Sequence, residues 1–249
     1  MPYAALTYTK KEHIAYLTLN RPKANNIINQ QLAQELVDAC SEINQDNEIY
    51  VVVITGAGGA FCCGSKLEPH QLSSQYRVAA AMASIDCPVI AVINGEALGE
   101  GLELALSCDI RLASPKAQFG FPQIAMGHIP SDGGTQRLPR IVGKGKAIEL
   151  ILTTETINAD EALAIGLVNK VVSNNNLASE AEALAKTIAN KGPIALKFIK
   201  EAVNKGLDLT LNQGLRLEAD LYFLLHTTAD RTEGITAFLQ KKSPQFKGQ

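Results

Sequence analysis

Residues 87–114 read CPVIAVINGEALGEGLELALSCDIRLAS, and this stretch carries the clearest structural signal in the chain. The run at 88–93 has the length and β-branched content of a buried strand, and the Asn-Gly pair at 94–95 ends it. Gly99 and Gly101 then lead into an apolar segment dense enough for a mostly buried helix. Because a helix N-terminus leaves backbone N–H groups unpaired, this strand, turn and helix predict a place that suits an oxyanion.

Glu103 argues against a purely structural turn, which is the alternative interpretation of this stretch. It is an ionisable side chain one turn beyond the expected N–H groups, inside an otherwise apolar segment. Burying a polar group without a partner costs about 2–7 kcal/mol, so its presence indicates a functional role. A first-turn acid favoured by the helix dipole is the other explanation.

The composition favours an ordinary globular protein. The 249 residues are 46% hydrophobic and 19% charged, which fits one sizeable domain or a domain with an appendage. The 23 Lys and Arg residues are spread out and outnumbered by 25 Asp and Glu, so the charge does not favour nucleic acid. The N-terminus has no apolar signal segment, and no run approaches the roughly 20 apolar residues of a membrane span. We therefore predict a cytosolic protein.

The cysteines and histidines point away from metal and disulfide chemistry. The 5 cysteines show no CxxC spacing, and the 4 histidines are not spaced as metal ligands. No GxSxG motif is present, which disfavours a nucleophilic triad. We expect Cys62 and Cys63 to be small core residues and His128 to be structural.

A second glycine-rich loop precedes this region. The segment at 13–20 alternates like a strand, 30–43 has helical spacing, and 50–55 is apolar like a buried strand. The loop that follows, GAGGAFCCGSKL, lacks both GxGxxG and GK[ST], so it predicts neither a Rossmann nor a P-loop site. Gly64 would let the backbone turn and present the N–H of the next residue, Ser65.

The order of these elements predicts parallel βαβ units, followed by a helical C-terminal region. The segment at 117–143 has Gly and Pro every few residues, which is typical of a functional loop. From 144 onward helices dominate, and Asn158 is a candidate N-cap. We divide the chain into an α/β core at 1–190 and a helical region at 191–249.

The helices after residue 190 have extensive apolar faces. We expect these faces to dock on a neighbouring subunit, and packing on the same chain is the alternative. The apolar residues concerned are Ile194, Leu196, Ile199, Val203, Leu215, Leu221, Leu224 and Leu225.

Several motifs together resemble the enoyl-CoA hydratase/isomerase (crotonase) superfamily over nearly the whole chain. They are NRPKANN at 20–26, AFCCGSKL at 60–67, the stretch at 88–114, AQFGFPQIAMGHIPSDGGTQRLPRIVG at 117–143 and TADRTEGITAFLQKKSPQF at 228–246. The resemblance implies an α/β, ClpP-like spiral of ββα units with a C-terminal helical trimerisation region. It also implies a homotrimer, or a hexamer made of two trimers.

The same resemblance implies an acyl-CoA thioester substrate, whose coenzyme A is part of the substrate rather than a separate cofactor. In the family, two backbone N–H groups stabilise the enolate-like anion that forms at the thioester oxygen, and they map onto Ser65 and Glu100. Glu100 stands where the family usually has glycine. Contacts to the adenine, ribose and phosphates map onto Lys23, Ala24, Ser65 and Leu67, with Tyr222 and Lys241 from an adjacent subunit. A solvated helix end is the alternative interpretation of Lys241.

Hydratases of the family hold a water molecule between two glutamates. One maps onto Glu103, and the other maps onto Gln123, whose carboxamide can hydrogen-bond but cannot transfer a proton near neutral pH. Glu103 could act as both base and acid, Glu100 or Asp132 could replace the missing acid, or the reaction could need only one base. An N-cap for the following helix is the alternative interpretation of Asp132.

We therefore expect an enzyme that adds water to an α,β-unsaturated acyl-CoA, with Glu103 as general base. Within the same superfamily, Gln123 leaves an enoyl-CoA isomerase, a dienoyl-CoA hydratase or a decarboxylase as alternatives. A non-catalytic CoA-binding protein is the alternative from another class. Acyl-chain specificity is expected to depend on residues 70–84 and on Phe121, Ile124 and Met126.

Overall fold

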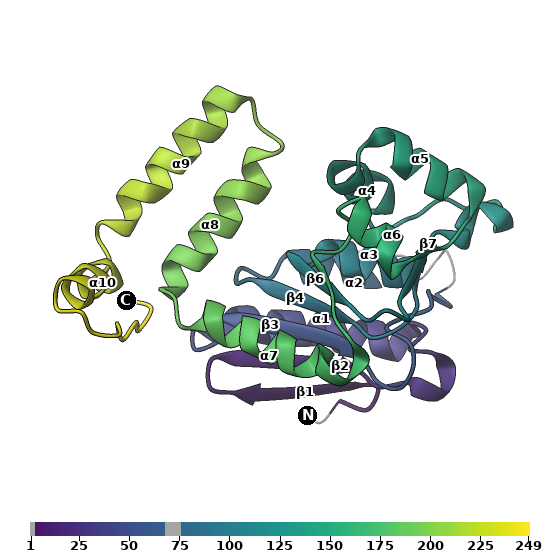
Figure 1. Ribbon diagram of the computed structural model, residues 1–249, viewed down its shortest axis with the longest axis horizontal. Helices are drawn as coiled ribbons and strands as arrows, with labels where there is room; N and C mark the ends of the chain where they lie inside the picture. The colour runs from purple at the N-terminus through teal and green to yellow at the C-terminus, as the bar shows by residue number, and fades with distance from the viewer. Residues whose placement is uncertain (1–2, 68–75) are drawn as a thin grey trace.

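The computed structural model describes residues 3–67 and 76–249, and a six-stranded sheet lies at its centre (Figure 1). The sheet has the order β1-β2-β3-β4-β6-β9, and every neighbouring pair after β1-β2 is parallel. Its strands are β1 (Leu6–Lys11), β2 (Ile14–Leu19), β3 (Val51–Gly56), β4 (Val89–Ile93), β6 (Ile110–Ala113) and β9 (Lys170–Val171). The predicted parallel core is therefore present.

The antiparallel hairpin of β1 and β2 was not expected. Glu12 turns it with a φ of 55°, and β1 is an edge strand whose last residues are exposed. Its lysines suit an edge that must not pair with another chain, but they also weaken its hydrophobic pattern. The sequence therefore carries little sign of this strand.

Helices cover both faces of the sheet. Val52 and Ile54 of β3 face the core cluster that includes α1 (Gln30–Gln45), α2 (Val78–Ala83) and α3 (Glu100–Ser107). Val51 and Val53 face the opposite cluster, which includes α7 (Asn174–Ala189). Because side chains alternate across a strand, a strand such as β3, which is apolar from Val51 to Ile54, requires cover on both sides.

A second sheet of short strands lies beside the first, and two of its strands lead directly into helices. Its order is β5-β7-β8, with β5 (Ala97–Leu98) parallel to β7 (Gln118–Gly120) and β8 (Ile157–Asn158) antiparallel to β7. The chain leaves β5 into α3, and it leaves β7 into η4 (Pro122–Met126). Because β5 and β7 run in the same direction, the residues that follow each strand lie at the same end of this second sheet.

The remaining helices of the core follow η4. They are α4 (Gly134–Val142), α5 (Lys144–Thr153) and α6 (Ala159–Ala164). Asn158 caps α6 as predicted: its side chain accepts a hydrogen bond from the N–H of Glu161, whose side chain accepts one in return from the N–H of Asn158. This reciprocal pair is a capping box.

The last three helices form an arm that reaches away from the sheet (Figure 1). We call residues 193–249 the arm; it holds α8 (Pro193–Gly206), α9 (Leu211–Leu225) and α10 (Ala229–Leu239). Lys200 ties α8 to the core, because its Nζ lies 2.8 Å from Asp109 Oδ2 and donates to Cys87 O at 3.0 Å. None of the described helices is long and apolar enough to cross a membrane.

The arm exposes many large apolar side chains. Of the residues singled out in the sequence, Leu221 is buried and Ile194 and Leu196 are partly buried, so part of the apolar surface packs within the chain. Large apolar side chains elsewhere on the arm, some of them singled out in the sequence, are more than half exposed: Ile199, Val203, Leu207, Leu211, Leu215, Tyr222, Phe223, Leu224, Phe238 and Leu239. Docking of this surface on a neighbouring subunit stays a prediction.

Candidate active site

Two glycine-containing turns lie side by side at the start of α3. Cys62 forms a parallel bridge with Ala97, and the N–H of Leu98 donates to Cys62 O at 2.9 Å. A Cβ on Gly101 would lie 2.0 Å from Cys62 O, so only glycine permits this approach. A Cβ on Gly99, whose φ is +54°, would lie 3.7 Å from Gly64 Cα. These close approaches bring the segments ending at residues 65 and 100 together.

The segment of Ser65 is fixed by the chain around Ile28. The N–H of Ile28 donates to Gly64 O at 2.9 Å, and the N–H of Lys66 donates to Ile28 O at 2.8 Å. Ser65 Oγ accepts from the N–H of Leu67 at 3.0 Å. The short helix η1 (Pro22–Ala24), which carries Lys23 and Ala24, ends four residues before Ile28, and Ile28 forms a parallel bridge with Ser65.

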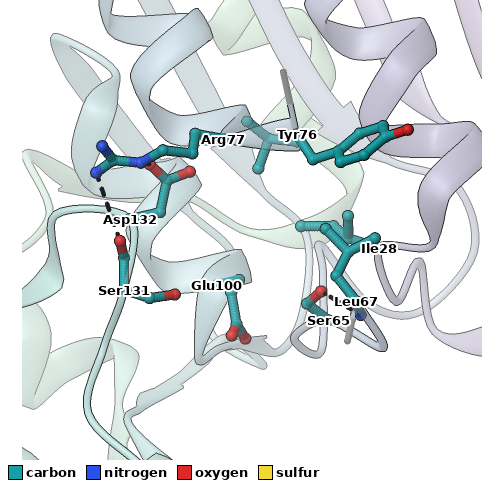
Figure 2. Close-up of a pocket in the computed structure, with 9 residues that line it drawn as sticks. Ile28, Ser65, Leu67, Tyr76, Arg77, Glu100, Ser131 and Asp132 are labelled. Carbon is teal, nitrogen blue, oxygen red and sulfur yellow. Dashed lines mark hydrogen bonds and ion pairs between the residues drawn. The ribbon is translucent and has the colours of Figure 1, made fainter. Parts of the chain in front are cut away.

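Glu100 directs its carboxylate back to the opening of its own helix. Burial raises the pKa of this carboxyl group, and the nearby backbone N–H groups of Glu100 and Ser65 partly oppose that rise. Oε2 lies 3.6 Å from the position of a Cβ on Gly64. Figure 2 shows the Glu100 side chain between Ser65 and Ser131. The backbone N–H groups of residues 65 and 100 therefore lie near the same anionic group.

Glu103 is fully buried and held at one oxygen only. Oε1 accepts from the N–H groups of Asp132 and Gly134, each at 2.7 Å. Oε2 has no hydrogen-bond partner among the described residues. Burial raises the pKa of Glu103 to about 7, the two N–H donors oppose that rise, and the charges of Glu100 and Asp132 add to it. A carboxyl group with such a pKa can exchange a proton near neutral pH.

Gln123, on η4, lies beside the same helix opening. It is 4% exposed, and neither its Oε1 nor its Nε2 has a hydrogen-bond partner in the described part of the chain. Nε2 lies 3.1 Å from the position of a Cβ on Gly99, so the amide stands over the turn that opens α3. Buried polar atoms are normally paired, so these atoms and Oε2 of Glu103 suit a polar ligand such as water.

Asp132 does not cap the helix that follows it, so that alternative interpretation is wrong. The N-cap of α4 is Gly133, and no side chain caps it. The Asp132 carboxylate instead reaches α2, where it accepts from the N–H of Ala79 at 2.6 Å and from Arg77 Nε at 3.3 Å. Burial raises its pKa. Asp132 thus joins α2 to the loop whose N–H groups hold Glu103.

A small cavity opens beside these residues, and Figure 2 shows its lining. Its volume is about 30 Å³, and Ser65, Leu67, Glu100 and Asp132 are among the residues that line it. Tyr222 and Lys241 do not line it; both are exposed on the arm. The chain therefore brings Ser65, Leu67, Glu100 and Asp132 to one cavity, and it does not bring Tyr222 and Lys241 there.

Other residues singled out in the sequence have simpler positions. Cys62 is fully buried, as expected, and burial raises its pKa to about 12; Cys63 is half-buried. His128 is exposed, so it is not a core residue, and its expected structural role stays a prediction. The described residues contain no group of three or more His, Cys, Asp or Glu side chains that could hold a metal.

The residues expected to set acyl-chain specificity differ in their exposure to solvent. Phe121 is buried, whereas Ile124 and Met126 are exposed. Part of the segment at 70–84 lies outside the described residues; its described part includes Arg77 and α2.

Two asparagines shape the glycine-rich loop through contacts that sequence reasoning missed. Asn26 is fully buried and donates to Ala57 O at 2.9 Å and Ala60 O at 2.8 Å. Asn94 donates to Gly56 O at 2.9 Å and Gly58 O at 3.0 Å. Both lie in motifs used to recognise the family, but their contacts are remote in sequence and have no local signature.

Comparison with known proteins identifies close relatives over the full length. Residues 9–249 match the family model described as enoyl-CoA hydratase/isomerase. The crotonyl-CoA hydratase of Syntrophomonas wolfei is 40% identical over 257 residues, which cover 99% of each chain. The short-chain-enoyl-CoA hydratase of Clostridium acetobutylicum is 39% identical and covers 94% of each chain.

A solved structure gives the same result for the fold. The crystal structure of an enoyl-CoA hydratase from Bacillus anthracis superposes with a TM-score of 0.95 at 38% identity, and covers 99% of this chain and 100% of that one. The α/β fold with a C-terminal helical region that the sequence predicts is therefore confirmed.

Proposed function

The chain belongs to the enoyl-CoA hydratase/isomerase (crotonase) superfamily, and we propose that it adds water to an α,β-unsaturated acyl-CoA thioester. The observation that carries this proposal is the state of Glu103. One of its oxygens is held by two N–H groups, and the other is buried beside the opening of α3 with no partner among residues 3–67 and 76–249. That arrangement suits a base that takes a proton from a bound water.

The proposed reaction depends on negative charge developing at the thioester oxygen. The N–H groups of Ser65 and Glu100 are suited to stabilise that charge, since both lie near the Glu100 carboxylate at the opening of α3 and favour its charged form. Preorganised donors in a site with little water are each worth about 2.7–4 kcal/mol of transition-state stabilisation. Being backbone groups, they are retained when the side chain at position 100 changes.

Glu103 and Gln123 would hold the attacking water between them. Oε2 of Glu103 accepts a proton from the water as its oxygen bonds to the β-carbon. The Gln123 amide offers both a donor and an acceptor, and neither is otherwise used by the described residues. Gln123 can thus orient the water but supplies no proton.

A second candidate reaction within the superfamily follows from Gln123. A site with one fixed carboxylate suits a double-bond shift, in which a single base removes a proton and returns it elsewhere. Hydration of a dienoyl-CoA and decarboxylation of an acyl-CoA are further alternatives at such a site. Hydration has more support, because the relatives described above are hydratases at about 40% identity.

A panel of enoyl-CoA thioesters incubated in deuterated water separates these reactions. Hydration adds one water to the acyl group, whereas isomerisation leaves the formula unchanged and only exchanges or moves hydrogen. We expect hydration, and we expect Glu103→Gln to abolish it. Binding of acyl-CoA with no product from the panel would favour the non-catalytic alternative.

Coenzyme A recognition and assembly belong to the same proposal. Ser65 and Leu67 line the cavity, and together with Lys23 and Ala24 they would contact the nucleotide part of the substrate. Tyr222 and Lys241 lie exposed on the arm and would reach the site of a neighbouring subunit. The apolar surface of the arm supports a homotrimer, or two trimers joined as a hexamer, with residues 191–249 as the oligomerisation region.

A further inference from the structure

Glu103 is held by the short loop at 131–134, so the position of this loop decides where the carboxylate lies. The N–H groups of Asp132 and Gly134 each donate to Glu103 Oε1 at 2.7 Å. A Cβ on Gly134 would lie 3.1 Å from Oε1 and 2.8 Å from a ring carbon of Phe121. Because the loop fits so closely, a shift of the loop would move the carboxylate or break its hydrogen bonds.

The same two donors decide which oxygen of Glu103 can act as a base. A carboxylate oxygen has two lone pairs, and those of Oε1 already accept two N–H groups. Within the described parts of the chain, Oε2 has no hydrogen-bond partner. Oε2 is therefore the oxygen left to accept a proton from water, as long as the loop keeps Oε1 in place.

The side chain of Asp132 fastens this loop to α2. Its Oδ2 accepts from the N–H of Ala79, in the first turn of α2, at 2.6 Å, and its Oδ1 accepts from Arg77 Nε at 3.3 Å. Arg77 Nη2 also donates to Ser131 O at 3.4 Å, and Figure 2 shows Arg77 beside both loop residues. Since α2 packs against α3, the loop is linked to α3 both directly, at Glu103, and through α2.

A second contact holds the backbone of the loop from the other direction. Arg137 Nη1, from α4, donates to Asp132 O at 2.7 Å. Arg137 follows the loop directly in sequence, so it can move together with the loop. The Asp132 carboxylate instead binds the N–H of a residue 53 positions away, and it thereby fixes the loop against the core.

The contacts of Asp132 suit holding the loop better than transferring a proton. Burial raises the pKa of Asp132, and the N–H of Ala79 and the charge of Arg77 oppose that rise. To deliver a proton, the carboxyl group would have to leave both partners. The loop would then lose its link to α2, and Glu103 would lose the support of its two N–H donors.

We propose that Asp132 is a positioning residue: its carboxylate anchors the loop at 131–134 to α2, and the anchored loop holds Glu103 Oε1 so that Oε2 faces the attacking water. This inference rests on the proposed function, in which Glu103 is the base. Asp132 acts through the backbone N–H groups that it keeps in place, and it exchanges no proton. Loosening the loop should therefore slow the chemical step and leave thioester binding largely unchanged.

Two substitutions at position 132 separate holding from proton transfer, because both remove the charge and only one keeps the anchor. Asp132→Asn retains an oxygen that can accept from the N–H of Ala79, whereas Asp132→Ala retains none. With crotonyl-CoA, we expect Asp132→Asn to keep most of the wild-type kcat and Asp132→Ala to lose about 10–10²-fold in kcat with little change in KM. Asp46→Ala is the control and should be fully active, since it also loses a backbone hydrogen bond and an ion pair, with Lys10, but outside the site.

Equal kcat values for Asp132→Asn and Asp132→Ala would overturn the inference. If both were equally inactive, Asp132 would be a proton donor, and if both were fully active, the anchor would have no part in catalysis. A fall in kcat/KM that came from KM alone would overturn it as well. If Asp132→Ala does not fold, Asp132→Ser takes its place, because its side chain is one bond shorter and lacks the second oxygen.

The pH dependence is a readout that a general loss of stability would not change. Besides burial, the N–H groups of Gly134 and Asp132 lower the pKa of Glu103, and the charges of Glu100 and Asp132 raise it. Both variants remove the Asp132 charge, but only Asp132→Ala loosens the two N–H donors. The midpoint at which kcat/KM falls with decreasing pH should therefore lie at a higher pH in Asp132→Ala than in Asp132→Asn. Equal midpoints would overturn the inference.

Hydrogen exchange separates a failure of this inference from a failure of the proposed function. A wild-type protein that hydrates no enoyl-CoA would overturn the proposed function and leave the anchor to be tested by the backbone amides of positions 132 and 134. These amides should exchange with solvent faster in Asp132→Ala than in the wild type or in Asp132→Asn. Equal exchange in all three proteins would overturn the anchoring itself.

Discussion

The core buries its apolar side chains, whereas the arm leaves many of its own exposed to solvent. In α3, every residue from Gly101 to Ser107 is buried, and the carboxylate within it is held by two N–H groups. In the arm, Phe223 is 67% exposed and Phe238 is 83% exposed. A chain does not normally leave so much apolar surface to water unless another surface covers it. The core is complete by itself, whereas the arm is suited to contact a second copy.

This difference separates two kinds of function. The groups proposed to carry out the reaction all lie in the core, where packing fixes them. The arm carries Tyr222 and Lys241, which are exposed and lie away from the cavity of their own chain. Changes in the core should therefore lower kcat without altering assembly, and changes in the arm should alter assembly and KM.

The largest effect is expected from Glu103→Gln in the core. The amide keeps the size of the side chain and an oxygen for the two N–H donors, but it cannot accept the proton from water. We expect kcat to fall about 10²–10⁴-fold, with an unchanged sedimentation coefficient. Glu48→Gln, at an exposed position of the core, is the control and should be fully active. Normal turnover by Glu103→Gln would show that another group is the base.

A slightly smaller loss of kcat is expected when the glycine-containing turns before Ser65 and Glu100 are forced apart. In Gly101→Ala the new Cβ would lie 2.0 Å from Cys62 O, so the segments carrying the Ser65 and Glu100 N–H groups must separate. Losing one such donor lowers kcat by about 10²–10³-fold. The control is Gly145→Ala in α5, where nothing lies within 4 Å of the new Cβ. Equal kcat values for the two variants, measured on folded protein, would refute the proposed oxyanion hole.

Acidic substitutions on the arm test its proposed role in assembly. The double variant Phe223→Asp/Phe238→Asp should stay folded, because both side chains are largely exposed, but it should not assemble. Without the neighbour's Tyr222 and Lys241, hydrogen bonds to charged groups worth about 1.5–3 kcal/mol are lost, so KM should rise about tenfold or more. Light scattering reports the assembly, with Gln45→Asp on α1 as a control that adds charge to the core. A double variant that assembles normally would contradict the role given to the arm.

The smallest expected effect is a change of pH. Glu103 must be ionised to act as a base, and its pKa is raised to about 7, so kcat/KM should fall as the pH is lowered through this value. The loss should reach about tenfold for each pH unit below the pKa. Because the groups that set this pKa lie in the core, the arm double variant should keep the same midpoint. A midpoint near 4.5, the ordinary value for Glu, would show that Glu103 is not the titrating base or is not buried during binding.

Much of the core could be predicted because its signals are local. The apolar run of β4, the glycines that open α3 and the cap at Asn158 each depend on residues close in sequence. The Glu103 side chain could be singled out for the same reason, since a lone acid in an apolar helix is visible without a structure.

The parts that could not be predicted depend on contacts between distant segments. The Asp132 carboxylate accepts a hydrogen bond from the first turn of α2 rather than from the helix that follows it, because the fold brings the Ala79 nitrogen within 2.6 Å of Oδ2. The carboxylate of Glu100 lies near the backbone N–H of Ser65, 35 positions earlier, across two packed turns. The β1 edge strand has a weak apolar pattern, and its pairing with β2 depends on a turn at Glu12.

The most direct test of the central claim is a crystal structure with an acyl-CoA bound. The account predicts the thioester oxygen about 2.7–3.1 Å from the backbone nitrogens of Ser65 and Glu100. A thioester oxygen bound away from both nitrogens would contradict it.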